Sequence, residues 1–324
     1  MKLALAAVLT LSLTTHAYAF EIETPVSNGC HEELALAAAT MARFPDTAAA
    51  PAPTEDQRRA MNDLVFLLPR EEPWSLALLI GVRSNDLRDN APTNLDGLFH
   101  VHDDPADQPA HCMRRQEDNG PEGDISALAA CRDFIVGELE AGGMLAETVD
   151  LTSTEPVSSF FRFRGVYELA LPRFAYRLGR AAHALQDGYT HSMRDAETGK
   201  VRHVLNWVDA FGDNEYSEAD DGYQHLSGLD DCRRTDPHQQ LRIDRARQAT
   251  ADLFAAVADQ RPGRRERVLA VVDAALARID GCDSTNRYCD APELEEDKGI
   301  RTFGCAVAGG AGGTATALLI ALLV

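Results

Sequence analysis

The stretch His183-Ala-Leu-Gln-Asp187-Gly-Tyr-Thr-His191 spaces three metal-binding residue types four positions apart. At 3.6 residues per helical turn, each step of four rotates the side chain by only about 40°, so one helix face presents His, Asp and His. Imidazole nitrogens and carboxylate oxygens are the ligands that zinc takes in catalytic sites, and a row spanning two turns can serve two neighbouring metals. The row therefore predicts a zinc centre organised on one helix.

The residues around this row decide between a buried and a solvated face. Ala182, Ala184, Leu185 and Tyr189 flank the row and are mainly apolar. A row of polar groups on a solvated face is the alternative, but an apolar helix is expected to be buried, and buried polar groups need partners. We therefore expect further ligands from other parts of the chain.

Helical periodicity extends through most of the chain, and no comparable alternating run predicts a sheet. The expected fold is all-α, a multi-helix single domain with long loops at 83–124 and 193–234, which are long enough to carry sites. The predicted helices cover residues 31–43, 55–68, 125–139, 169–192, 239–258 and 264–279.

Residues 1–19 have the order of a secretory signal peptide. Lys2 is followed by a mainly apolar run and then by Ala17-Tyr18-Ala19, which is typical of a cleavage site. The apolar run is shorter than the about 20 residues that a spanning helix needs. The sequence thus predicts an exported protein with Phe20 as its mature N-terminus.

The other end carries a second targeting signal. Cys305 opens an uncharged, Gly- and Ala-rich stretch that turns apolar towards Val324. It resembles the Cys-led C-terminal sorting tails of myxobacterial-type exported proteins, although those end in an Arg cluster; a plain membrane anchor is the alternative. The acidic segment 283–304 is expected to tether this tail to a domain at 20–282. We expect the cell envelope or outer surface as the location, either anchored in the membrane or released after tail processing.

Six cysteines precede Cys305, an even number that is typical of exported, disulfide-bonded proteins. Local pairs of Cys282 with Cys289 and of Cys112 with Cys131 would leave Cys30 to pair with Cys232, although the sequence leaves other connectivities open. No C-x2-C pair indicates a cysteine-based zinc site.

The formal net charge of -20 bears on the class of partner. A strongly acidic surface repels phosphate backbones and argues against a duplex nucleic acid partner. Bound metal cations can nevertheless dominate the field inside a cleft, so a phosphodiester substrate remains compatible with this charge.

Several other residues can complete the centre. His31 is near enough to Phe20 for the mature α-amino group to share its metal, and His225 lies near both Asp230 and Cys232, which can hold it rigid. His102, His111 and His238 are expected at the surface or in supporting positions. The expected metal ligands are Phe20, His31, Asp86, His100, His183, Asp187, His191 and His225.

These pieces, spanning residues 20–232, resemble the zinc-dependent phospholipase C superfamily, whose helical fold is shared by single-strand nucleases with the same three-zinc cluster. The matches to the family pattern are Phe20 with His31, Asp86-x13-His100 and His183-x3-Asp187. The family's next histidine follows after five residues, whereas His191 follows after three. That variant resembles the bacterial heterokaryon-incompatibility-like branch.

The last family element, His-x3-Glu, is altered in this chain. His203 is at a suitable distance from His191, but its fourth neighbour is Trp207. His225 with Asp230 or Asp231 is the competing solution. We favour His225 because His203 fits a core histidine equally well.

The resemblance implies an exported, phospholipase C-like phosphodiester hydrolase with two or three zinc ions, acting on a phospholipid or another phosphodiester. Asp86 matches the family residue that orients or deprotonates the attacking water, so it is expected to be both ligand and base. A single-strand nuclease is one alternative, but aromatic residues, which stack on bases, make up only 6% of the chain. A zinc-stabilised surface protein without turnover is the other, and the altered His-x3-Glu element favours it.

Overall fold

The computed structural model describes residues 29–42, 54–63, 73–91, 94, 97, 101–102, 104–115, 117–161, 165–206 and 216–294. The expected signal peptide, the tail at 305–324, Phe20 and His100 lie outside the described residues. Among the described residues, no helix is long and apolar enough to cross a membrane.

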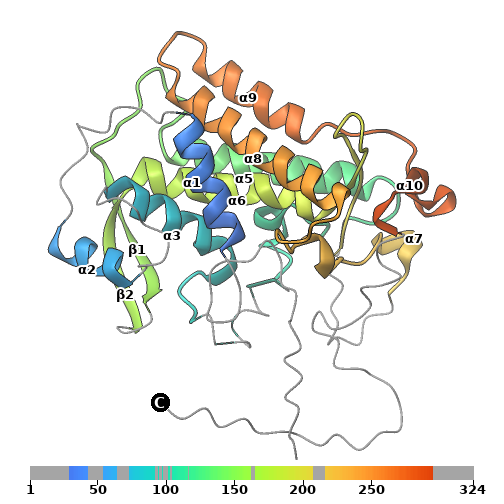
Figure 1. Ribbon diagram of the computed structural model, residues 1–324, viewed down its shortest axis with the longest axis horizontal. Coiled ribbons are helices and arrows are strands. Elements are labelled where there is room, and N and C mark those ends of the chain that lie inside the picture. Colours follow the sequence, from blue (N-terminus) through green and yellow to red (C-terminus); the bar gives the residue numbers. More distant parts are fainter. Residues whose placement is uncertain are drawn as a thin grey trace, which may run out of the picture.

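The chain is mainly helical, which confirms the predicted class (Figure 1). The phospholipase C type within that class remains a prediction. The longer helices are α1 (Cys30–Met41), α2 (Glu55–Asp63), α3 (Pro73–Leu87), α5 (Gly123–Ala141), α6 (Arg173–Thr190), α8 (Pro237–Ala258) and α9 (Arg264–Ala275). The short helical segments are η2 (Gln108–His111), α7 (Glu218–Asp221), η3 (Ser227–Leu229), η4 (Ser284–Asn286) and α10 (Arg287–Asp290).

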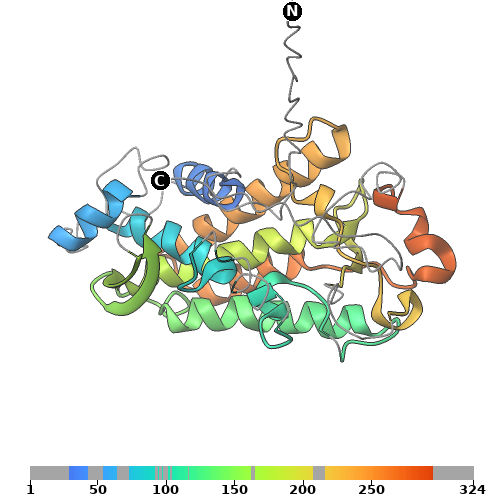
Figure 2. The same ribbon diagram turned by 90° about the horizontal axis from the view of Figure 1, so that it is seen from below.

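Helix α6 is the centre of the core. Seen from below, it lies between α5 on one side and α1 and α8 on the other (Figure 2). Every residue from 181 to 190 is buried, as the apolar flanks of the His-Asp-His row predict. The metal-binding row is therefore inside the protein and faces other elements rather than solvent.

Two glycines bring α3 and α6 into backbone contact. A Cβ on Gly81 would lie 2.0 Å from the carbonyl oxygen of Tyr176, and one on Gly179 would lie 2.2 Å from the carbonyl oxygen of Leu78. Only glycine fits at such a close approach. Because Asp86 follows Gly81 by five residues and His183 follows Gly179 by four, the same contact brings these two side chains together.

The sequence-based assignment missed α3. The predicted loop at 83–124 is wrong for its first residues, because α3 continues to Leu87 and carries Asp86. Residues Leu76 to Val82, apart from Gly81, form an unbroken apolar run, and every residue of that run is buried. A helix that is apolar on all sides shows no amphipathic period, so periodicity could not reveal it.

Two small antiparallel sheets correct the expectation of a purely helical domain. Strand β1 (Thr154–Phe161) pairs with β2 (Gly165–Pro172) from Thr154 opposite Pro172 to Phe161 opposite Gly165. Strand β3 (Ser192–Arg194) pairs with β4 (Val201–Val204). The predicted helix at 169–192 is therefore a strand up to Pro172. Each strand of the first hairpin buries few side chains, Val157 and Phe161 in β1, which leaves too short an alternation to detect.

The three predicted disulfides are confirmed: Cys30–Cys232, Cys112–Cys131 and Cys282–Cys289. The first joins the start of α1 to the segment before α8, and the second joins the residue after η2 to α5. The third closes a short loop that contains η4 and ends in α10.

Residues 283–294, expected to begin a tether, are folded against the domain. Glu293 is buried and pairs with Arg242 at 2.7 Å, and the same carboxylate oxygen accepts a hydrogen bond from the Arg194 backbone N–H. The Tyr288 hydroxyl contacts the Glu218 carboxylate at 3.0 Å. These buried polar contacts hold the segment in place, and the acidic residues 295–304 lie outside the described residues.

Replacing Gly179 with alanine should lower the free energy of unfolding by about 1–3 kcal/mol, because the new methyl group collides with the α3 backbone. The matched control is Gly137→Ala in α5, where a Cβ meets nothing within 4 Å. That exposed helical substitution should stabilise by about 0.5–1 kcal/mol. Chemical denaturation of both variants checks the close contact, and an unchanged Gly179→Ala midpoint would contradict it.

Candidate metal centre

Asp187 lies at the middle of a buried group of histidines that come from separate elements. Its side chain is 1% exposed, and its Oδ1 lies 3.1 Å from Nε2 of His31 in α1. Its Oδ2 lies 2.9 Å from Nε2 of His183, one turn earlier in α6. The same oxygen lies 3.1 Å from Nδ1 of His111 in η2. The two carboxylate oxygens thus face different histidines.

Asp86 provides a second carboxylate to the same group. Its Oδ1 lies 3.4 Å from Nε2 of His183 and 3.7 Å from Nδ1 of His111. It also lies 3.3 Å from Nε2 of His102. Asp86 therefore connects the α6 histidine with the two histidines that follow α3.

A third group adjoins the first two at the C-terminal end of α6. His191 Nε2 lies 3.6 Å from Asp230 Oδ1, and His225 Nε2 lies 3.0 Å from Asp230 Oδ2. The ring centroids of His191 and His111 are 6.5 Å apart, so the groups are neighbours. Three side chains of zinc-binding type, with Asp230 fully buried, converge there.

Four separations between facing ligand atoms lie near the edge length of a tetrahedral zinc site. The four N–O separations among Asp86 Oδ1, Asp187 Oδ2, His111 Nδ1 and His183 Nε2 run from 2.9 to 3.7 Å. Zinc bonds of 2.0–2.2 Å imply tetrahedral edges of roughly 3.4 Å. Two carboxylates and two imidazoles already stand at those separations.

Several buried atoms of these groups are without a hydrogen bond among the described residues. They include both ring nitrogens of His183, Nε2 of His111 and both carboxylate oxygens of Asp230. Other nitrogens of the same groups do hydrogen-bond, as His111 Nδ1 does to Asp187 Oδ2 at 3.1 Å. Unpaired buried polar atoms are costly, and a cation bound in each group would satisfy those that point into it. The donor set fits a metal ion.

Charge in the cluster favours a cation. Burial raises the pKa of the Asp187 carboxyl. The facing histidines, chiefly His183, have a larger effect in the opposite direction, so the pKa lies well below its usual value. The pKa of Asp86 is lowered in the same way, against the effect of burial and chiefly by His183. Both carboxylates are ionised at neutral pH, which draws positive charge to the site.

The histidines differ in protonation. Burial lowers the pKa of His111 to about 4, so its imidazole is neutral at pH 7 and can donate a lone pair to a metal. Burial also opposes charge on His191, but Asp187 and Asp230 outweigh it and raise the pKa of His191 to about 9. A metal cation at Asp230 would take the place of that proton.

Two hydrogen bonds orient the ligand rings. His31 Nδ1 donates to Oε1 of Gln186 at 2.7 Å, and Gln186 donates in turn to the Thr250 hydroxyl at 3.4 Å. His191 Nδ1 donates to the carbonyl oxygen of His111 at 2.7 Å. In both rings Nε2 is left facing a carboxylate, which is the arrangement that fixes the tautomer of metal-bound histidines.

The structure brings most of the sequence-predicted ligands together. His31, Asp86, His183 and Asp187 meet in the central groups, and His191 and His225 meet at Asp230. Of the two acids left open, Asp230 rather than Asp231 faces the histidines. Phe20 and His100 lie outside the described residues. Both expected long loops carry site residues.

His111 and His102, which are expected at the surface or in supporting positions, lie against the carboxylates of the central groups. The His111 side chain is 1% exposed and contacts both Asp86 and Asp187. His102 is 17% exposed and faces Asp86. The available signal for His111 was its position next to Cys112, because a disulfide fixes the backbone of its neighbours. His238 is exposed, as expected.

His203 is a structural histidine, separate from these groups. Its Nδ1 lies 3.1 Å from the Asp124 carboxylate, and its Nε2 accepts a hydrogen bond from the Tyr223 backbone N–H. Its ring also packs on Tyr288. Both ring nitrogens are used, which agrees with the core position that was the alternative for this residue.

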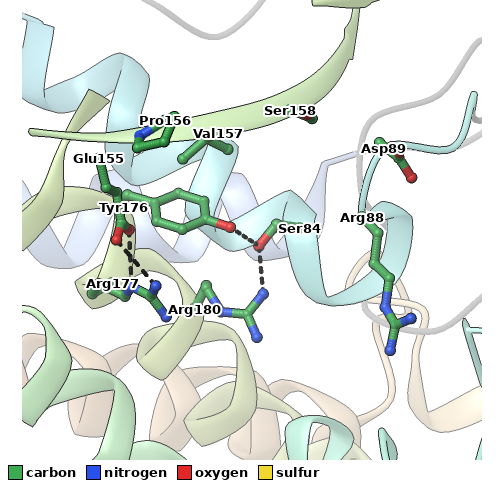
Figure 3. Close-up of a pocket in the computed structure, with 10 residues that line it drawn as sticks. All are labelled: Ser84, Arg88, Asp89, Glu155, Pro156, Val157, Ser158, Tyr176, Arg177 and Arg180. Atoms are coloured by element: carbon green, nitrogen blue, oxygen red, sulfur yellow. Dashed lines mark hydrogen bonds and ion pairs between the residues drawn. The ribbon is translucent and has the colours of Figure 1, made fainter. Parts of the chain in front are cut away.

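A cavity of about 350 Å³ lies between β1, α3 and α6 (Figure 3). None of its lining residues belongs to the metal groups, by which we mean the histidines and carboxylates gathered around Asp86, Asp187 and Asp230. Ser84 contacts both the Tyr176 hydroxyl and the Arg180 guanidinium there. Arg177 is paired with Glu155 and Glu138. Because the charges of Arg177 and Arg180 are already compensated, we assign no ligand to this cavity.

Zinc content tests the centre directly. Asp187→Asn should remove at least one zinc equivalent per chain. The substitution removes one of the two negative charges of Asp86 and Asp187, and it removes the carboxylate that faces three histidines. Asp195→Asn is the matched control, since Asp195 pairs with Arg202 away from the groups. Elemental analysis of both purified variants measures their zinc content, which the control should keep. Equal zinc in wild type and Asp187→Asn would be evidence against the centre.

Gln186→Leu should weaken zinc binding by about 10–100-fold, as loss of a hydrogen bond that orients a ligand typically does. The size of the side chain is kept while His31 loses its acceptor. Gln248→Leu on the exposed side of α8 is the control. Competition with a chromophoric chelator measures both affinities, and identical values would show that Gln186 does not position His31.

Comparison of the chain with protein-family models, with curated proteins and with solved structures gave no match. The assignment of a metal centre therefore rests on the geometry and chemistry of the residues described above.

Proposed function

We propose that the protein is a zinc-dependent phosphodiester hydrolase of the phospholipase C type. The observation that carries the proposal is the placement of adjoining metal-binding groups along one helix, with Asp187 facing the first and His191 facing the second. Adjacent zinc ions would clamp phosphoryl oxygens, stabilise developing charge and lower the pKa of a water molecule.

The exposure of the ligands indicates where a substrate would approach. His31 and His183 are completely buried, whereas the side chains of His102 and His225 are 17% and 11% exposed. The group of His191, His225 and Asp230 has three protein ligands, and zinc sites that catalyse keep a fourth position open. We place the reacting phosphate on this side.

The chain's own residues would divide the remaining work. Asp86 is held ionised and near the more exposed His102, so it can accept a hydrogen bond from a water molecule and orient it. Asp230 is ionised as well, its pKa kept low by His225 and His191 although burial raises it. It would hold both rings in place while a substrate binds.

The location and substrate belong to the same proposal. Six disulfide-bonded cysteines agree with export, and the sequence features at both ends favour a site of action at the cell envelope. A phospholipid is the phosphodiester most abundant there. The acidic chain and its few aromatic residues make single-stranded DNA the weaker candidate.

One observation favours a second function, a zinc-stabilised surface protein without turnover. The groups that contain Asp86, His111, His183 and Asp187 are buried and surrounded by protein side chains, which is typical of a structural zinc site. Turnover by the zinc-loaded protein therefore decides between the two functions.

Activity assays on the purified zinc-loaded protein separate these functions. We expect release of diacylglycerol from phosphatidylcholine, loss on chelation and recovery with added zinc. Asp86→Asn should lower turnover by about 10²–10⁴-fold, and the exposed His238→Ala should leave it unchanged. Cleavage of single-stranded DNA alone would indicate a nuclease. Full zinc occupancy with no hydrolysis of either substrate would indicate the structural role.

A further inference from the structure

Three of the six disulfide-bonded cysteines lie beside residues of the metal groups. Cys30 directly precedes His31, and Cys112 directly follows His111. Cys232 follows Asp230 by two residues. The two bonds formed by these cysteines, Cys30–Cys232 and Cys112–Cys131, are therefore attached to three of the chain segments that supply ligands.

The Cys112–Cys131 bond holds the segment that carries His111. The 3-10 helix η2 ends at His111, and Cys112 adopts the left-handed conformation with φ 49° and ψ 38°, which stops the helix. Cys131 is fully buried in α5. Sγ of Cys112 also lies 2.9 Å from the carbonyl oxygen of Ala184, the neighbour of His183. The disulfide thus fixes His111 relative to both α5 and α6.

His111 passes this constraint to the neighbouring group. Its carbonyl oxygen accepts the hydrogen bond from His191 Nδ1 that turns Nε2 of His191 towards Asp230. A displacement of the backbone at Cys112 would therefore move His111. It would also break the hydrogen bond that turns His191 towards Asp230.

The Cys30–Cys232 bond connects two further ligands that are far apart in sequence. His31 lies in the first turn of α1, and Asp230 follows the short η3 turn in a segment with little regular structure of its own. The bond spans 202 residues and ties this segment to the helix that bears His31. Without it, the Asp230 segment has fewer constraints on its position.

The third bond provides a contrast. Cys282–Cys289 closes a loop of the C-terminal segment, and neither cysteine adjoins a residue of the metal groups. It contributes a covalent constraint of the same kind at a different place. Any effect that depends on ligand placement should therefore distinguish this bond from the other two.

We propose that Cys30–Cys232 and Cys112–Cys131 are positioning elements of the metal centre, so that the full zinc complement is bound only after both have formed. The inference rests on the proposed zinc centre and adds an oxidation step before metal loading. In that step each pair of thiols loses two protons and two electrons to the disulfide of an exchange partner, which becomes a dithiol.

Two physical reasons connect the oxidation with the metal. Zinc ligands must stand within about 0.2 Å of their bonding distances, which a freely moving loop does not maintain. Thiolates are also strong zinc ligands, so without these two bonds the chain would offer four competing sulfurs, three of them close in sequence to His31, His111 and Asp230. Disulfide formation both places the histidines and removes their competitors.

The test compares three double variants of the full chain after identical zinc loading and removal of free metal. Cys112→Ser with Cys131→Ser, and Cys30→Ser with Cys232→Ser, should each lose at least one zinc per chain while keeping the wild-type helical circular dichroism. Cys282→Ser with Cys289→Ser is the matched control and should keep the wild-type stoichiometry. Cobalt substitution gives a second readout, since the visible bands of tetrahedral cobalt should weaken only in the first two variants.

The outcomes separate this inference from the proposed function. Wild-type zinc content in all three variants would overturn the positioning role and leave the zinc centre intact. Absence of zinc from the oxidised wild-type protein would overturn both. If a serine pair loses the native circular dichroism, Cys112→Val with Cys131→Ala restores most of the buried volume; unfolding of that pair too would show a purely structural role and contradict the proposal.

Discussion

The structure depends on the burial of one ionised carboxylate. Asp187 is 1% exposed in the last turn of α6, where its neighbours are mainly apolar, a position that is very costly for a charge without partners. Its partners are histidines from α1, η2 and α6 itself, which converge on its two oxygens. Imidazoles compensate a carboxylate by carrying protons or by sharing a metal, and His111, which is neutral at pH 7, favours the metal.

The surrounding fold serves this convergence. The glycine contact between α3 and α6 sets Asp86 opposite His183, and the Gln186 hydrogen bond aims His31 at Asp187. Each of these contacts joins segments far apart in the chain. None of them alone would hold four ligands at zinc-binding separations, and together they leave little freedom for rearrangement. The centre is therefore built into the core, while the more exposed His102 and His225 mark the side open to chemistry.

The sequence predicted what periodicity and residue type encode, namely the helices, the disulfide pairs and the row from His183 to His191. It missed what depends on tertiary contacts. Helix α3 is apolar all round and has no readable period, and the first hairpin buries only short alternating patches. His111 looked like an isolated histidine because its partners, Asp86 and Asp187, are 25 and 76 residues away. The acid that faces His191 and His225 could not be chosen from the sequence, because Asp230 and Asp231 are the same residue type and differ only in burial.

X-ray diffraction at the zinc absorption edge, on crystals of the purified protein grown with zinc, tests the central claim most directly. We expect one anomalous peak within bonding distance of His111, His183 and Asp187, and another bounded by His191, His225 and Asp230. Anomalous density absent from both positions, with these histidines and carboxylates paired to each other or to water instead, would contradict the assignment of a metal centre.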